Sequence, residues 1–445
     1  MRFVIISDTH FGDREGTLVS CKGDVPEIGP RYDEFKERAG ERNDYLILLG
    51  DILDFSIENY NDVYPAARVF FRQIQKDKIA RKVIYVPGNH DFDLWDTIEY
   101  EVNVICQIKE GDDVSPFRMS VPGVIDDRFG SLDQGFKLYP GLTKKRDPEE
   151  SSYDGLFLDS ITTSAKGHQG KPTKFIFTYP NLYIVTDEES ILITHGHYLE
   201  LYWEVLGEIA RLAFRDKLNI ANPDSLAIKE MVSMNFPLCQ LACSGVGQAG
   251  PLTDVVQKVQ RSVKDRKPDD IKDFLNRLDD AIDTLTSYRW WHPMEVGREV
   301  AKDAASGVAK WLLKRQLGKY KDTRYNKEFM EKKEVQRRFA DYFKTSCREI
   351  RTINEKFDQA IPDPHIVIFG HTHDPVPWGA STLNTENFGI PGLPKVMLYN
   401  TGGWLNRRKG DEVEFCGAEV FTYRTGEGFK SYPIGYERAE VGRPD

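Results

Sequence analysis

Short apolar runs alternate with longer amphipathic stretches along the first part of the chain. The runs cover residues 2–6, 45–49 and 83–86, and the stretches between them, at 32–39 and 62–78, repeat apolar positions at helical spacing. A strand, helix, strand order of this kind predicts parallel strands joined by crossover helices. The first part of the chain is therefore expected to form an α/β sheet.

Polar side chains follow each of these apolar runs, and two later runs, at residues 191–194 and 366–369, end in the same way. The residues that follow the five runs are Asp8 and His10; Gly50, Asp51 and Asp54; Gly88, Asn89, His90 and Asp91; His195 and His197; and Gly370, His371 and His373. Because ligand sites of α/β sheets lie beyond the carboxyl ends of the strands, the five strand ends are expected to converge on one polar site.

Two long segments interrupt this pattern. Residues 92–182 begin with a predicted helix and then become rich in Gly, Asp, Pro and Ser, which predicts a loop-rich insert with a pair of strands near residues 175 and 183. Residues 198–362 repeat apolar positions at helical spacing, for example at Leu199, Tyr202 and Leu206, and at Ile271, Phe274 and Leu278. We expect a helical insert or lid over 198–362, and a core made of residues 1–197 and 363–445.

Composition narrows the class of protein. The chain has 445 residues, of which 40% are hydrophobic and 29% charged, and its net charge of -10 gives no strong nucleic-acid signal. Its apolar runs are too short for a transmembrane segment, and because Met1 leads directly into the first polar block, no signal peptide is expected. Six scattered cysteines favour reduced thiols. A cytoplasmic location is expected.

One region departs from the acidic average. Residues 301–350 contain fourteen Lys and Arg against seven Asp and Glu, which is a local excess of seven positive charges. This excess indicates either a solvated helical face or attraction to an anionic partner, such as a phosphorylated substrate or an acidic membrane surface. Peripheral membrane contact and a homo-oligomer both stay open.

The five polar blocks together resemble those of the calcineurin-like metallophosphoesterase superfamily. They occur in that superfamily's order, they contain six of the nine histidines, and the stretch from Tyr399 to Gly403 resembles the Asn-x-Gly turn that usually follows its last block. The resemblance covers about residues 1–95, 183–197 and 363–435. It implies an α/β fold, a four-layer α/β/β/α sandwich with two sheets packed face to face, here with a large helical insertion.

The resemblance also implies a role for each matching residue. Asp8, His10 and His373 would hold a first divalent metal, Asn89, His195 and His371 a second, and Asp51 would bridge both. His90 would protonate the leaving oxygen or stabilise charge there, with Asp91 orienting it, while a hydroxide bridging the two metals attacks phosphorus. Asp54 is expected to orient a ligand, and His197 to support a ligand or contact substrate. Arg14, just past the first block, either reaches a phosphate or is solvated.

Carboxylate, imidazole and amide ligands suit Mn²⁺, Fe²⁺ or Zn²⁺ better than Ca²⁺, and manganese is the expected metal. The expected activity is hydrolysis of a phosphomonoester, phosphodiester or pyrophosphate bond in a small-molecule or lipid-like substrate. The helical insert is similar to the lid of UDP-2,3-diacylglucosamine pyrophosphatases, although this chain has His90 where those enzymes have Arg. The alternative is a non-catalytic scaffold that docks partners through the insert, and the complete ligand set favours an enzyme over it.

Overall fold

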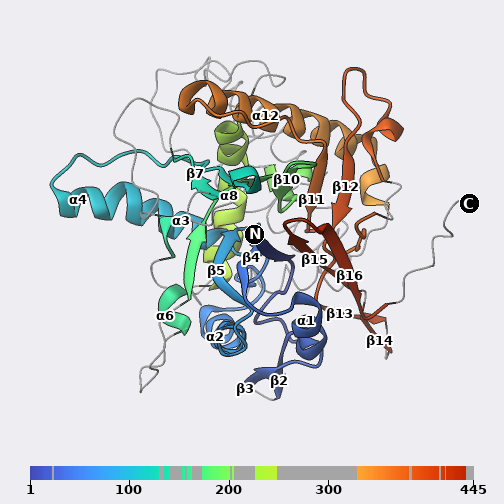
Figure 1. The fold of residues 1–445 in the computed structure, drawn as a ribbon. Coiled ribbons are helices and arrows are strands. Elements are labelled where there is room, and N and C mark those ends of the chain that lie inside the picture. Colours follow the sequence, from blue (N-terminus) through green and yellow to red (C-terminus); the bar gives the residue numbers. More distant parts are fainter. Residues whose placement is uncertain are drawn as a thin grey trace, which may run out of the picture.

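Two six-stranded sheets form the centre of the molecule (Figure 1). The computed structural model describes residues 1–22, 25–129, 135–140, 153–155, 158–162, 173–200, 203–204, 226–247, 328–379, 383–409, 412–415 and 417–436. Within them, helices cover the outer face of each sheet. This is the α/β/β/α arrangement that the sequence predicts.

The first sheet contains the amino-terminal strands and runs in the order β16-β15-β1-β4-β5-β8. Four of its strands are parallel, namely β1 (Arg2–Ile6), β4 (Asn43–Leu49), β5 (Ala80–Val86) and β8 (Lys174–Phe177). The antiparallel hairpin of β15 (Ala418–Arg424) and β16 (Gly428–Ile434) completes it. The parallel register places the ends of β1, β4 and β5 side by side, with Ile6 opposite Leu48 and Leu49 opposite Val86.

The second sheet runs in the order β12-β11-β10-β9-β6-β7. Its strands are β6 (Gly123–Asp126), β7 (Phe136–Leu138), β9 (Asn181–Val185), β10 (Ser190–Thr194), β11 (Ile366–Phe369) and β12 (Met397–Asn400). Strands β10, β11 and β12 are parallel, although β10 and β11 are far apart in the sequence. This pairing brings the last polar block of the chain beside His195.

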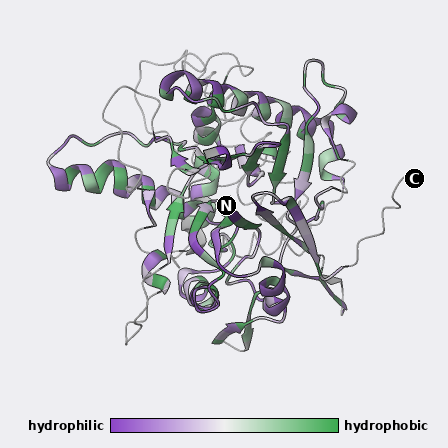
Figure 2. Ribbon diagram, viewed as in Figure 1, coloured by the Kyte–Doolittle hydropathy of each residue, from purple (hydrophilic) through white to green (hydrophobic). Residues whose placement is uncertain are grey.

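Alternating side chains fill two different cores. One set of apolar residues from both sheets, including Ile47 and Ile84 of the first and Ile193 and Ile368 of the second, packs together between the sheets. Their neighbours in the chain point to the opposite faces, where they join the cluster under the helices. Figure 2 shows green on strands of both sheets, while the helices carry both green and purple. Strands buried on both faces account for the unbroken apolar runs in the sequence.

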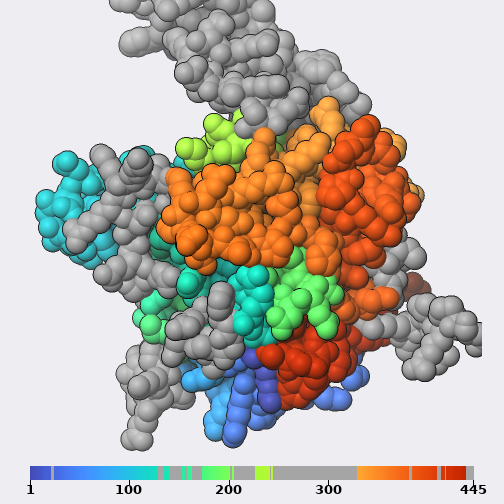
Figure 3. All heavy atoms as spheres, turned by 45° about the horizontal axis from the view of Figure 1, so that its top comes forward, coloured from blue at the N-terminus to red at the C-terminus, as the bar shows by residue number. Residues whose placement is uncertain are grey.

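Helices cover both outer faces. Helices α1 (Tyr32–Ala39) and α2 (Tyr60–Lys76) lie on the first sheet, and α12 (Lys333–Phe357) lies across the second, on the opposite side of the molecule (Figure 1). Figure 3, turned so that the top of Figure 1 comes forward, shows α12 across the surface. Hydrogen bonds tie α12 to the sheet beneath it, from the Tyr342 hydroxyl to Asn181 Oδ1 (2.7 Å) and from the Tyr183 hydroxyl to Glu349 Oε2 (2.8 Å).

The remaining described elements surround these layers. They are the hairpins β2 (Val19–Lys22) with β3 (Val25–Ile28) and β13 (Asn406–Lys409) with β14 (Glu412–Phe415), and the helices α3 (Phe92–Tyr100), η1 (Glu101–Ile105), α4 (Cys106–Glu110), α6 (Leu158–Thr162), η4 (His197–Leu199) and α8 (Ile228–Gly247), with short turns at Asp127–Phe129, Phe329–Glu331 and Thr385–Phe388. None of the described helices combines the length and the hydrophobicity needed to cross a bilayer.

The interrupting segments differ from their expected form. The strands expected as a pair near residues 175 and 183 do not pair, because β8 hydrogen-bonds to β5 in the first sheet and β9 to β10 in the second. Residues 92–182 also supply β6 and β7, so their described part is more than a loop-rich insert. The region 198–362 is represented by α8 and α12, and the predicted helix at 271–285 lies outside the described residues. The domain boundaries stay predictions.

A candidate metal centre

The polar blocks lie together at one edge of the sandwich. Strands β1, β4 and β5 of the first sheet and β10 and β11 of the second carry them at their carboxyl ends. All seven expected ligands are buried, with at most 5% of any one residue exposed, and they are Asp8, His10, Asp51, Asn89, His195, His371 and His373. Five segments that are separated in the sequence thus meet at one buried polar centre.

Unusual backbone conformations aim several of these side chains. Nine non-glycine residues in the described part of the chain have positive φ, and five of them are expected ligands, with φ of 46° to 68°. These five are Asp8, His10, Asp51, His371 and His373. Such conformations cost energy for residues with a Cβ, and surrounding structure must enforce them. The backbone strain of this fold is therefore concentrated where the strands turn back over the site.

Glycines allow the backbone to approach the ligands closely. A Cβ on Gly370 would come 2.4 Å from Asp8 Oδ2, and one on Gly50, whose φ is +74°, would come 2.5 Å from His195 Nδ1. Neither contact is sterically allowed, so any larger residue would displace the side chain it touches. Gly50 and Gly370 are thus packing requirements of the site.

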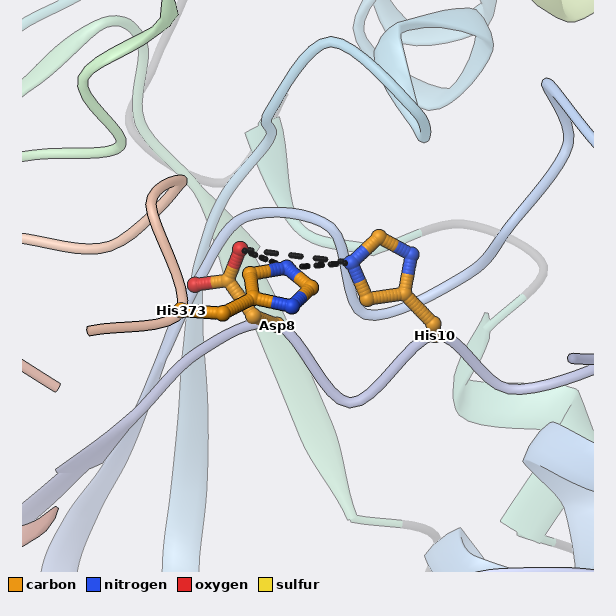
Figure 4. A group of neighbouring side chains, drawn as sticks. All are labelled: Asp8, His10 and His373. Atoms are coloured by element: carbon orange, nitrogen blue, oxygen red, sulfur yellow. Dashed lines mark hydrogen bonds and ion pairs between the residues drawn. The ribbon is translucent and has the colours of Figure 1, made fainter. Parts of the chain in front are cut away.

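The first ligand group combines residues that lie far apart in the sequence. His373 Nε2 lies 3.1 Å from Asp8 Oδ1 and 3.0 Å from His10 Nε2, so both rings and the carboxylate face one another (Figure 4). The Asp8 carboxylate also accepts the backbone N–H of His371 at 3.0 Å from each oxygen. Two imidazole nitrogens and a carboxylate oxygen within 4.8 Å of one another form a compact cation site.

The second ligand group is built around Asp51. Asp51 Oδ2 lies 3.1 Å from His195 Nε2, and Asp51, His195 and His371 each offer an atom within 4.8 Å of the others. Asn89 is fully buried next to this group, and neither polar atom of its amide has a hydrogen-bond partner among the described residues. Because an unsatisfied buried amide is costly, Asn89 fits a ligand for a cation at this position. The residues present therefore suit divalent metals.

Asp54 links the first ligand group to His90. Its Oδ2 lies 2.9 Å from His10 Nδ1 and its Oδ1 lies 2.7 Å from His90 Nδ1. Burial would raise the pKa of the Asp54 carboxyl, but the charges of His90 and His10 hold that pKa well below its ordinary value. Asp54 is thus an anionic acceptor shared by two imidazoles.

Asp91 has a different position from the one expected. Its Oδ1 accepts the backbone N–H of Gly88 at 2.6 Å, and its Oδ2 accepts the N–H of Ile52 at 2.8 Å and the Tyr85 hydroxyl at 2.6 Å. Asp91 therefore braces the turns after β4 and β5, and Asp54 rather than Asp91 contacts the His90 ring. His90 and Asp91 are neighbours in the sequence, but consecutive residues in a turn point in different directions.

His197 and Arg14 lie outside the two ligand groups. His197 is fully buried, with Nε2 3.2 Å from the Tyr179 hydroxyl. Burial, together with the charges of His195 and His371, lowers the pKa of His197 well below its ordinary value, so its ring is neutral. Arg14 is exposed on the loop after His10, and no described contact joins it to either ligand group. His197 thus lies beside the ligand His195, with 5.6 Å between the ring centroids, and Arg14 has the environment of a solvated residue.

Two residues of the helical region lie next to the candidate metal centre, although no sequence motif indicates this position. Glu200 Oε2 lies 2.9 Å from His371 Nε2, and the ring of Trp203 lies 6.2 Å from that of His90 between centroids. Both follow η4 in a stretch whose apolar spacing predicts an ordinary helix. Only the tertiary position of η4 indicates that they belong to the site.

Comparison with known proteins agrees with this geometry. The family model described as calcineurin-like phosphoesterase matches residues 1–233, which is more than half of the 445-residue chain. No curated protein matches the chain. The family match ends before β11, and the structure places His371 and His373, which follow that strand, against the matched residue Asp8. The chain belongs to the calcineurin-like phosphoesterase family.

Proposed function

We propose that this protein is a metal-dependent phosphoesterase that works with two divalent ions. The observation that carries the proposal is the pair of buried carboxylate and imidazole groups, Asp8, His10 and His373 on one side and Asp51, His195 and His371 on the other. Members of this family are in general hydrolases of phosphoester bonds. A buried set of so many titratable groups is costly without a cation, which supports the same conclusion.

The ligand roles that we propose combine the two groups with the family resemblance. Asp8, His10 and His373 would hold one ion, Asn89, His195 and His371 the other, and Asp51 would contact both. Bound there, two divalent cations would lower the pKa of a water and offset the negative charge of phosphoryl oxygens. Mixed oxygen and nitrogen donors favour Mn²⁺, Fe²⁺ or Zn²⁺. Manganese, a cytoplasmic location and a lipid-like substrate remain predictions from the sequence.

His90 is the residue that we assign to the leaving group. Its side chain is 13% exposed, more than that of Asp51 or His10, so it faces the side from which a substrate arrives. Asp54 accepts from Nδ1, which orients the ring and stabilises its protonated form. A protonated His90 can donate from Nε2 to the oxygen that leaves phosphorus, so that no alkoxide has to be expelled.

Hydrolysis by metal-stripped protein with and without added Mn²⁺ tests the proposal. The panel is a phosphomonoester, a phosphodiester, a nucleoside-diphosphate conjugate and single-stranded DNA. We expect Mn²⁺ to restore hydrolysis of at least one class, and the class identifies the bond. A protein that binds two ions and hydrolyses no member of the panel would instead support a scaffold.

The His90→Asn variant tests the assigned role. Turnover on the best substrate should fall about 100-fold or more, because the general acid is lost, while the bound metal stays the same. The matched control is His365→Asn, since His365 lies at the surface with Glu189. Equal turnover of His90→Asn and wild type would remove His90 from the reaction.

A further inference from the structure

Glu200 contacts a ligand of the metal centre although no family block contains it. Its carboxylate oxygen Oε2 lies 2.9 Å from His371 Nε2, and its side chain is only 8% exposed. A buried carboxylate at this distance from a ring nitrogen accepts the N–H of that nitrogen. The proton of the His371 ring is therefore held on Nε2, and Nδ1 is left with its lone pair.

Two other ligand histidines are fixed by the same kind of contact. Asp54 Oδ2 lies 2.9 Å from His10 Nδ1, and the backbone oxygen of Leu49 lies 3.0 Å from His195 Nδ1. In each ring one nitrogen is bound to an acceptor, and the other is left to bind a cation. Such contacts orient metal-binding imidazoles and increase their basicity, and their loss typically costs 10- to 100-fold in metal affinity. Glu200 would complete the pattern for His371.

We propose that Glu200 is a positioning residue of the metal centre, which fixes the His371 ring for the ion held by Asn89, His195 and His371. The inference rests on the proposed function, because it concerns the same centre. Under this inference, the segment that follows β10 affects metal affinity directly through Glu200.

Helix α12 holds Glu200 in place from the other side. Arg338 of α12 donates to the backbone oxygen of Tyr198 at 3.0 Å and pairs with the Glu204 carboxylate. These two contacts lie on either side of Glu200 in the sequence, so they fix the backbone that carries it. Arg338 is 15% exposed, which strengthens its pairing relative to that of a surface arginine. The position of α12 on the second sheet therefore determines where the Glu200 carboxylate lies.

The test is calorimetric titration of Mn²⁺ into the metal-stripped, full-length protein. For wild type we expect two bound ions. Glu200→Gln keeps an acceptor oxygen and loses the charge, so one of the two affinities should fall about 10-fold; Glu200→Ala should lower the same affinity about 100-fold. The other affinity should stay within about twofold of wild type, which a general loss of folding would not produce.

Matched controls separate positioning from a structural effect. Glu189 also pairs with a histidine, since its Oε2 lies 2.6 Å from His365 Nε2 at the surface, and Glu189→Gln should leave both affinities unchanged. Arg338→Met should weaken the same ion as Glu200→Gln by a smaller factor, whereas Arg337→Met, at the exposed neighbouring position, should not. Circular dichroism checks that each variant is folded. If Glu200→Ala does not fold, the titration of Glu200→Gln alone tests the inference.

The outcomes are distinct. If both Glu200 variants bind two Mn²⁺ ions with the affinities of wild type, the inference is overturned and the proposed function stays intact. A wild-type protein that binds no Mn²⁺ would overturn the proposed function, and the inference with it. Complete loss of one ion in Glu200→Gln, as in a His371→Ala reference, would also overturn it, because that result identifies Glu200 as a direct ligand.

Discussion

Two buried acidic residues of this protein have opposite charge preferences. Asp54 lies between the imidazoles of His10 and His90, which stabilise its anion. Glu99 of α3 is equally buried, but its partners are mainly neutral, namely backbone N–H groups of Arg118 and Met119 and the Tyr153 hydroxyl. Burial raises the pKa of Glu99 to about 7, although these hydrogen bonds lower it. At the scale of a residue, the neighbours determine which form is stable.

This difference predicts a pH dependence of stability. Between about pH 4.5 and 7 the folded state keeps a proton on Glu99 that the unfolded state has released, so the free energy of unfolding should fall as pH rises through this window. In Glu99→Gln, the decrease in the free energy of unfolding with rising pH should be smaller by up to about 3 kcal/mol. This variant should therefore be more stable than wild type at pH 8. Urea unfolding at several pH values measures this. The control is Glu110→Gln at an exposed position, and parallel curves for Glu99→Gln and wild type would contradict the prediction.

At the scale of an element, α12 acts as the outer layer of the second sheet. Its buried side includes Phe339, Phe343 and Ile350, which pack in the cluster that also contains Val367 and Leu398 of the sheet. The same helix carries Arg338 toward η4. One helix therefore stabilises the fold and orders the segment beside the metal centre.

Removing one buried ring from α12 should destabilise the whole protein. Phe343 is 1% exposed, and Phe343→Ala should lower the free energy of unfolding by about 3–5 kcal/mol, because the cavity and the lost apolar burial add. Lys344→Ala, at the next and exposed position, is the control and should change it by less than about 0.5 kcal/mol. Denaturant unfolding of the three proteins measures the difference. Equal effects of the two variants would show that α12 does not pack on the sheet.

Elements with local signals could be predicted from the sequence, and those that depend on distant partners could not. Strands β1 and β11 begin and end as their apolar runs indicate, and each delivers polar residues at its end. The sheets to which β8 and β9 belong could not be predicted, because a short apolar run does not identify the strands with which it pairs. Glu200 was missed for a similar reason, since its importance depends on a histidine 171 positions later.

At the scale of the whole molecule, the candidate metal centre contains residues from both sheets. Asp8 and Asp51 come from the first sheet, and His195, His371 and His373 come from the second. A cation that binds both sets holds the two sheets together. Bound metal should therefore contribute to global stability.

Metal removal should lower the melting temperature. A ligand that binds only the folded state adds about 2.7 kcal/mol when its free concentration is 100 times the dissociation constant. Thermal unfolding of chelator-treated protein, with and without Mn²⁺, measures this effect. Asp8→Asn should respond less than wild type, because it lacks one carboxylate of the first group, and Asp33→Asn on α1 is the exposed control. Identical melting with and without Mn²⁺ would contradict a cation that bridges the sheets.

The first ligand group also determines when the centre can form during synthesis. His373 follows Asp8 by 365 positions (373 minus 8), yet their side chains lie 3.1 Å apart. At about 5–20 residues per second, the ribosome makes His373 roughly 20 to 70 s after Asp8. A nascent chain that has already folded β1, β4 and β5 therefore still lacks a complete set of ligands. Under the proposed function, metal loading would be a late event after synthesis, and chains that terminate before His373 would lack a ligand of the first group.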